Sequence, residues 1–407
     1  MKKKKLFFLS VIVGLIVFFS RCIQSENKKD PRGKAYAGSS TCKACHQQIS
    51  NSYFHTAHFH SADTASFSTI DGSFSRDSNV YVVNDTTTIA MEKRNGVPFQ
   101  VLYINGKEKR AERFDIVFGN AKGQTYLYWR GDLLFQLPLS YFESLHSWTS
   151  SPGFPSDQVI FDRPIYQRCF QCHTSYIKES PGQESNLHNA AGLDKTNVIY
   201  NIDCERCHGP AATHAKFHTE YPNEKVGRYV VSYKSLTRAQ KIDMCGVCHS
   251  GAKNFMLRST FGFLPGDTLS HFMLQEKKID TNATRPDVHG NQPRLLALSK
   301  CYMQSDMTCT SCHDTHQKDR GNFLQYAQRC QACHSEINHN FCKMADATNI
   351  SWLQNNCTRC HMPGQLSKVI TVKTSSNDIS TPVSMINHRI AIYREESKRI
   401  AEAMRTK

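Results

Sequence analysis

The sequence is poor in apolar residues. Only 39% of its 407 residues are hydrophobic, and its mean hydropathy is -0.50. The length alone would suggest two or three ordinary domains. So few apolar side chains predict a thin protein core instead, and we expect bound apolar groups to complete the interior.

Long hydrophobic runs are also missing, apart from one short run near the N-terminus. Residues Leu6 to Phe19 are mostly apolar and follow four lysines, which is the pattern of an export signal. The run is shorter than the roughly 20 residues of a bilayer-spanning helix. We therefore expect residues 1–21 to be a signal peptide. The protein should be exported, to the periplasm or to the outer membrane or cell surface.

Cys22 lies directly behind this run and resembles the acylation site of bacterial lipoproteins, although Arg21 replaces the usual small residue. We expect a lipid anchor at Cys22. Plain cleavage and an uncleaved N-terminal anchor are the alternatives. Residues 22–36 are polar and rich in lysine, and they are interpreted as a tether.

Cysteine, in contrast, is abundant and regularly placed. Of the 17 cysteines, fourteen fall into seven copies of the string Cys-x-x-Cys-His. The motifs are Cys42-Cys45-His46, Cys169-Cys172-His173, Cys204-Cys207-His208, Cys245-Cys248-His249, Cys309-Cys312-His313, Cys330-Cys333-His334 and Cys357-Cys360-His361.

This string has a specific chemical use. Two thiols on one helical turn can each form a thioether to a porphyrin vinyl group, and the adjacent histidine then ligates the iron. Zinc ribbons use pairs of Cys-x-x-Cys without a fixed following histidine. Thioredoxin-like pairs would not recur seven times, and a disulfide framework would not fix the histidine. The sequence therefore predicts seven covalently attached haems c.

The formal charge of +15 could indicate binding to nucleic acid or to a membrane surface. Each haem carries two propionates, so seven haems add roughly 14 negative groups, partly offset by ferric iron. The complete protein should therefore be nearer to neutral than the bare sequence, and we expect no nucleic-acid partner.

The ligand on the far side of each iron decides the chemistry. When histidines occupy both axial positions, the iron binds no further ligand and can only transfer electrons. An iron with one axial position free can bind a small molecule. Twelve histidines lie outside the motifs, enough to close seven irons. They are His55, His58, His60, His146, His188, His214, His218, His271, His289, His316, His339 and His388. Met303, Met307 and Met344 are less favoured, because methionine more often fills gaps in a core.

Several strings resemble the extracytoplasmic multihaem cytochromes related to cytochrome c-554. The resemblance extends from about Tyr36 to the end of the chain. It rests on four strings, namely CKACH followed by Tyr53 to His58, CERCHGP followed by His214, CTSCHDTH ending at His316, and CTRCHMP followed by Asn387 to Ile390.

The resemblance implies that the trailing histidines ligate the iron of neighbouring haems. This role is assigned to His58, His214, His316 and His388. His339, between the sixth and seventh motifs, is a fifth candidate. His289, His271, His218 and His146 compete for the remaining two positions.

The residue pattern changes in the segment between the first two motifs. Strand-like runs separated by turn signals such as Asn95-Gly96 and Asn105-Gly106 predict an antiparallel meander. The expected organisation is a first haem-binding segment at 37–63, a small antiparallel β insert at 64–143, a multihaem core at 144–375 and a C-terminal segment at 376–407 with a distal histidine and an exposed helix. The fold class expected is a mainly α or irregular core with a haem-filled interior.

Two functions remain open. The favoured one is an electron carrier with bis-histidine haems, serving other redox proteins or quinol-linked membrane complexes, and not an enzyme. The alternative is an oxidoreductase acting on a small nitrogen or sulfur compound at one open haem, with His188 or His218 as a catalytic group. No motif has lysine in place of histidine, which disfavours one class of nitrite reductase.

Two cysteines remain after the motifs and Cys22 are assigned. Cys301 and Cys342 flank the fifth and sixth motifs. In an oxidising compartment they are expected to form a disulfide, and buried free thiols are the alternative.

Overall fold

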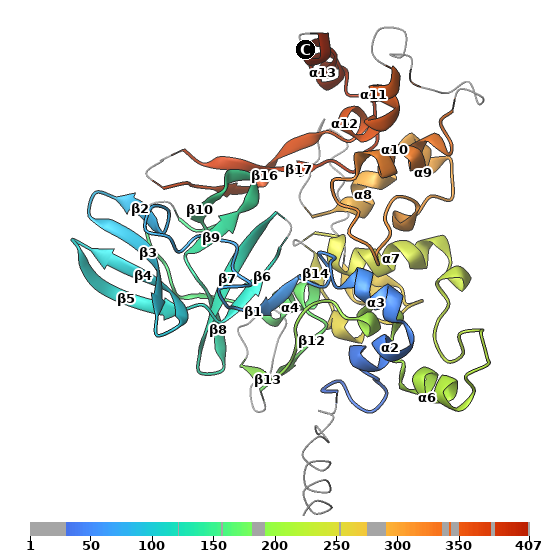
Figure 1. Ribbon diagram of the computed structural model, residues 1–407, viewed down its shortest axis with the longest axis horizontal. Coiled ribbons are helices and arrows are strands. Elements are labelled where there is room, and N and C mark those ends of the chain that lie inside the picture. The colour runs from blue at the N-terminus through green and yellow to red at the C-terminus, as the bar shows by residue number, and fades with distance from the viewer. Residues whose placement is uncertain are drawn as a thin grey trace, which may run out of the picture.

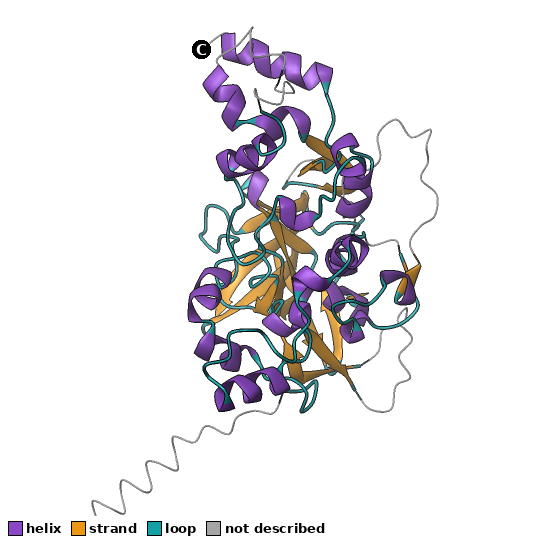
Figure 2. Cartoon of the chain, turned by 90° about the vertical axis from the view of Figure 1, so that its right-hand side faces the viewer, coloured by secondary structure: helices purple, strands orange, loops and turns teal. Residues whose placement is uncertain are grey.

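The computed structural model describes residues 30–120, 122–155, 158–180, 192–251, 254–274, 290–335, 342, 350–375 and 379–405. Strands β2 to β10 gather on one side of the molecule and most helices on the other (Figure 1). Seen from the helical side, the helices lie in front of the sheets (Figure 2). Cys22, His188, His289 and His339 lie outside the described residues.

The chain enters the structure through two short helices. They are α2 (Ser39–Cys45) and α3 (Gln47–Tyr53), and His46 separates them. The loop after α3 carries His58, whose carbonyl oxygen accepts a hydrogen bond from the Ile202 amide at 3.0 Å. This bond fixes the first motif segment against the region of the third motif.

A four-stranded meander follows, as the strand-like runs predict. Its strands pair in the order β2-β3-β4-β5, all antiparallel. They are β2 (Val80–Asn84), β3 (Thr87–Arg94), β4 (Val97–Ile104) and β5 (Lys107–Arg113). The Asn95-Gly96 and Asn105-Gly106 turns both have positive φ at their two central residues. That conformation matches the twist of a two-residue hairpin, and asparagine followed by glycine adopts it at low cost.

A second, seven-stranded sheet packs with this meander. Its main path is β1-β6-β7-β8-β11, and β9 joins β7 and β10. The strands are β1 (Ala62–Thr64), β6 (Ile116–Phe118), β7 (Gly123–Arg130), β8 (Leu133–Gln136), β9 (Leu139–Phe142), β10 (Ser147–Ser150) and β11 (Arg163–Pro164). Trp148, Tyr126 and Phe114 meet in its core. The β structure therefore continues past residue 143.

The helical side consists of short helices. They are α4 (Gln167–His173), α5 (Cys204–His208), α6 (Ala212–Glu220), α7 (Arg238–His249), α8 (Gln292–Ala297), α9 (Lys300–Met303), α10 (Phe323–Gln331), α11 (Ile350–Asn355), α12 (Cys357–His361) and α13 (Arg394–Arg405). None of the residues of α2, α6 or α12, all of them described, is buried by protein atoms. The expected exposed C-terminal helix corresponds to α13.

Three hairpins were not expected from the sequence, so the fold contains more sheet than a mainly α or irregular core. They are β12 (Tyr176–Glu179) with β13 (Leu193–Ile199), β14 (Phe255–Met256) with β15 (Met273–Leu274), and β16 (Gly364–Val372) with β17 (Thr381–Ile386). The β16–β17 hairpin extends from the last motif to the β-rich side (Figure 1). There the amide of Ser150 donates to the carbonyl of Lys373, and the amide of Val82 donates to the Ser375 hydroxyl.

None of the helices in the described ranges has the length and apolar character that a bilayer span requires.

Candidate haem sites

All seven motifs lie within the described residues, and each is on or beside a short helical segment. The motif histidines His173, His208, His249 and His361 are the last residues of α4, α5, α7 and α12. A single helical turn holds the two thiols on one side, and the following histidine ends the helix. This is the local geometry that two thioethers and one iron ligand require.

The structure brings motif histidines together with histidines from distant parts of the chain. Four such pairs lie within the described residues. They are His46 with His214 (ring centres 6.3 Å apart, planes 15° apart), His58 with His249 (6.1 Å, 75°), His208 with His316 (6.0 Å, 15°) and His313 with His388 (6.3 Å, 29°). Each pair joins one motif histidine to one of the four trailing histidines that the family resemblance implies.

The separation of these rings fits one iron between them. An imidazole centre lies about 1.2 Å from its nitrogens, given ring bonds close to the 1.33 Å of a conjugated C–N bond. With two metal–nitrogen bonds of about 2 Å each, the ring centres should be roughly 6.4 Å apart. The observed 6.0 to 6.3 Å agrees with this spacing, whereas direct stacking would bring the rings much closer.

Hydrogen bonds at Nδ1 leave the other ring nitrogen available to a metal. His214 Nδ1 lies 2.7 Å from the carbonyl oxygen of Arg228, and His388 Nδ1 lies 3.3 Å from that of Ile386. Among the motif histidines, His361 Nδ1 lies 3.0 Å from the Ala391 carbonyl. A carbonyl at Nδ1 fixes the tautomer and the ring orientation, as is usual for histidines that bind metals.

Burial keeps several of these rings in the neutral form that can bind iron. Burial, with the nearby His58 ring as the next cause, lowers the pKa of His249 to about 4. Burial is also the first cause that lowers the pKa of His58, His208 and His388. A protonated imidazole has no free lone pair, so a lowered pKa suits a metal ligand.

Thiols of different motifs also lie side by side. Four pairs of thiols from different motifs lie close enough for each thiol to shift the pKa of the other. They are Cys42 with Cys204, Cys172 with Cys248, Cys245 with Cys309 and Cys330 with Cys357. The first motif therefore neighbours the third, the fourth neighbours both the second and the fifth, and the sixth neighbours the seventh. Electrostatic interactions further link Cys207 to Cys248 and Cys312 to Cys330.

Other candidate ligands have different surroundings. His173 stacks on Phe118 of β6, with ring centres 4.7 Å apart and planes 6° apart. His218 lies 4.6 Å from His214, ring centre to ring centre, and its Nε2 accepts a hydrogen bond from the Arg228 amide. His146 ends a turn in the β-rich part, with a φ of 45°.

Cys301 and Cys342 are both free, so the expected disulfide is not formed. Cys301 lies instead near Cys312 and Cys330, and Cys342 near Cys360. In the described part of the chain, no three His, Cys, Asp or Glu side chains converge as a bare metal ion would need.

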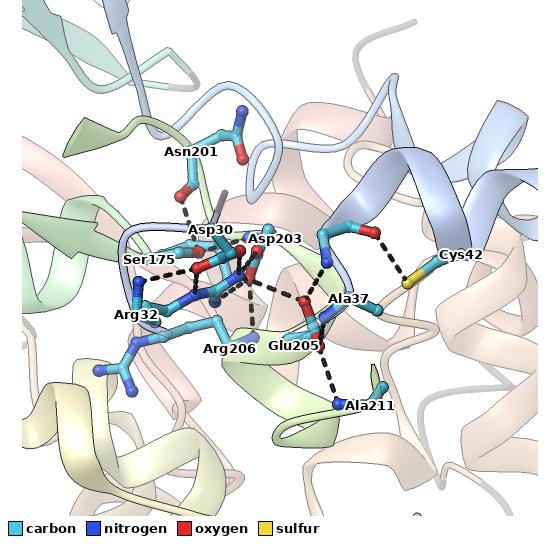
Figure 3. Close-up of polar contacts among 12 residues, drawn as sticks. Asp30, Arg32, Ala37, Cys42, Ser175, Asn201, Asp203, Glu205, Arg206 and Ala211 are labelled. Atoms are coloured by element: carbon cyan, nitrogen blue, oxygen red, sulfur yellow. Dashed lines mark hydrogen bonds and ion pairs between the residues drawn. The ribbon is translucent and has the colours of Figure 1, made fainter. Parts of the chain in front are cut away.

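A buried ionic cluster holds residues 30–36, called here the N-terminal arm, beside the third motif. The Arg32 guanidinium bonds to Asp30, Asp203 and Glu205 at 2.9, 2.7 and 3.3 Å (Figure 3). The arginine side chain is 5% exposed, and the three carboxylates are 9, 4 and 1% exposed. Glu205 also accepts the amides of Ala37, Gly38 and Ala211.

This cluster, called here the clasp (Asp30, Arg32, Asp203 and Glu205), was not expected from the sequence. Residues 30–36 belong to the segment interpreted as a tether, yet the clasp holds them against α5. Asp203 is also the N-cap of α5, accepting a hydrogen bond from the Arg206 amide. The arm therefore ends at the helix that carries Cys204 and Cys207.

Motif helices with facing histidines are the arrangement of a multihaem c-type cytochrome, and comparisons with known proteins support that class. Residues 155–209, which contain the second and third motifs, match the family Cytochrome c554 and c-prime. A comparison with curated proteins finds no match.

Among solved structures, the chain resembles the outer cell wall cytochrome OcwA. The TM-score is 0.53 at 15% sequence identity, and the match covers 90% of this chain and 82% of the other. At this identity the likeness shows the fold alone.

Proposed function

We propose that this protein is an extracytoplasmic cytochrome with seven haems c that transfers electrons through bis-histidine iron centres. Four histidine pairs at the spacing of a six-coordinate iron carry the proposal. Bound haem would supply a one-electron iron couple at each motif. The chain itself would supply the histidines for both axial positions of the iron, and it holds neighbouring motifs together.

The thiol contacts support a continuous path for electrons. Neighbouring motifs run in the order first, third, fourth, fifth, sixth and seventh, and the second lies beside the fourth. Thiols this close together would place the attached porphyrins next to one another. A path of this kind, with one side branch, suits a conduit between two redox partners.

The N-terminal sequence and the fold likeness support a proposed location and proposed partners. A signal peptide at residues 1–21 and an acylated Cys22 would keep the protein outside the cytoplasm and on a membrane. Its partners would be other redox proteins or quinol-linked membrane complexes. The fold likeness to an outer cell wall cytochrome supports an extracytoplasmic setting.

Ligand binding tests the carrier role. The ferric protein should have an all-low-spin spectrum that nitrite, hydroxylamine and, after reduction, carbon monoxide leave unchanged. Replacing His214 by glycine should open one iron and create a carbon monoxide-binding, high-spin component. His55→Gly is the control, because His55 is not in any of the four pairs. A native protein that already binds these molecules would support the alternative, an oxidoreductase.

A further inference from the structure

The loop after the fifth motif places a carboxylate near His313, and helix α10 places a phenol beside it. His313 Nδ1 lies 3.4 Å from the Tyr326 hydroxyl, which donates to Asp319 Oδ1 at 3.1 Å. Asp319 Oδ2 lies 3.9 Å from the same Nδ1, beyond hydrogen-bond distance. Asp319 therefore acts on His313 through Tyr326.

The direction of each hydrogen bond follows from the number of protons. A phenol has one hydrogen, and an ionised carboxylate can only accept. The Tyr326 hydrogen therefore points to Asp319, and the phenolic oxygen is left to accept the Nδ1 hydrogen of His313.

The surroundings hold this relay in place. The Asp319 side chain is 11% exposed, and its Oδ2 also accepts the Asp314 amide at 3.2 Å. The Tyr326 ring meets the His313 ring edge to face, at 5.5 Å between centres. By contrast, Nδ1 of His173, His214 and His361 faces a neutral backbone carbonyl.

We propose that Asp319, acting through Tyr326, lowers the reduction potential of the haem at the fifth motif. The inference rests on the proposed function, because it requires iron on His313. A carboxylate linked to Nδ1 pulls the proton away from the ring and makes the imidazole a stronger donor. A stronger donor stabilises ferric over ferrous iron, so the potential falls. Asp319 and Tyr326 are positioning residues, since neither touches the metal.

The test is a spectroscopically monitored redox titration of the complete haem-loaded protein. Asp319→Asn keeps the shape and the bond from the Asp314 amide but removes the charge. For one haem component of the titration, we expect the ratio of reduced to oxidised haem at a given potential to rise about tenfold. This corresponds to a midpoint potential about 59 mV higher for a one-electron couple. Tyr326→Phe should move the same component upward. That component should be the one that His388→Gly removes from the low-spin spectrum.

Asp314→Asn is the matched control. Asp314 lies in the same loop, but its Oδ1 is 3.8 Å from Nδ1 of His316, which pairs with His208. This variant should leave the fifth-motif component where it is. Unchanged potentials in both Asp319→Asn and Tyr326→Phe, with seven haems present, would overturn the inference. A protein without haem would instead overturn the proposed function.

Discussion

The rings of His58 and His249 meet nearly at right angles, with planes 75° apart and centres separated by 6.1 Å. The other three pairs are much closer to parallel, at 15°, 15° and 29°. The angle between two axial imidazoles decides how strongly they split the iron d orbitals. Parallel rings split these orbitals and give a rhombic electron paramagnetic resonance signal. Perpendicular rings leave the orbitals nearly degenerate and give a highly anisotropic signal.

Electron paramagnetic resonance should therefore distinguish the haem at the fourth motif. The ferric protein should show a highly anisotropic low-spin signal from this haem beside rhombic signals from the first, third and fifth. His58→Gly should remove the anisotropic signal, and His214→Gly should remove a rhombic one. The opposite pattern in these two variants would show that the pairs are assigned to the wrong irons.

Breaking the clasp should destabilise the protein. Arg32→Gln leaves three buried carboxylates without their cation, a change that typically costs about 3 kcal/mol or more. Arg94→Gln is the control, because Arg94 and Glu108 are 32% and 45% exposed and such pairs contribute about 0 to 1 kcal/mol. Thermal unfolding followed by circular dichroism should show a larger loss for Arg32→Gln. Equal losses would contradict a stabilising clasp.

The clasp should also open in acid. Burial alone would raise the pKa of Asp30, but its hydrogen bonds and ion pair with Arg32 outweigh burial and hold it below 3.8. A carboxyl with a lowered pKa stabilises the fold fully above its unfolded value and loses that contribution as the pH falls through its folded value. The free energy of unfolding, measured by denaturant titration, should therefore stay level above pH 4 and fall below it. In Asp30→Asn the fall should be smaller, and an unaltered acid profile would rule out Asp30 as its source.

Gly209 should resist substitution. It follows His208 with a φ of +77°, and a Cβ there would lie 3.2 Å from Cδ of Pro265. Gly209→Ala should cost about 1 to 3 kcal/mol through the backbone alone, because a φ of 77° with a ψ of -178° is a conformation that essentially only glycine adopts. It should also reduce haem retention at the third motif. Gly262→Ala is the control, since a Cβ there meets nothing within 4 Å. The comparison is made by thermal unfolding and by haem content, and similar stability of the two variants would contradict the expectation.

The local features of this protein could be predicted from its sequence. The motifs are contiguous, and the turns at Asn95-Gly96 and Asn105-Gly106 adopt the conformation expected for these residues. The four trailing histidines were singled out by their strings. The pairing of His58 with the fourth motif and of His316 with the third was not predicted, because pairing depends on how distant segments pack.

The features that were missed are those that depend on tertiary contacts. Asp30 and Arg32 belong to a polar segment that resembles a tether, and only the distant Asp203 and Glu205 make their burial favourable. The β16–β17 hairpin contains a strand-like run from Val369 to Val372, but its place in the fold is set by contacts with Ser150 and Val82. Single-sequence patterns do not contain such contacts.

The intact mass of the purified protein tests the central claim most directly. The account predicts seven tetrapyrrole additions that survive denaturation, because each haem is held by two thioethers at one motif. Replacing both cysteines of one motif by alanine should remove one addition and leave six. A colourless protein, or one whose mass equals that of the bare polypeptide, would contradict the account.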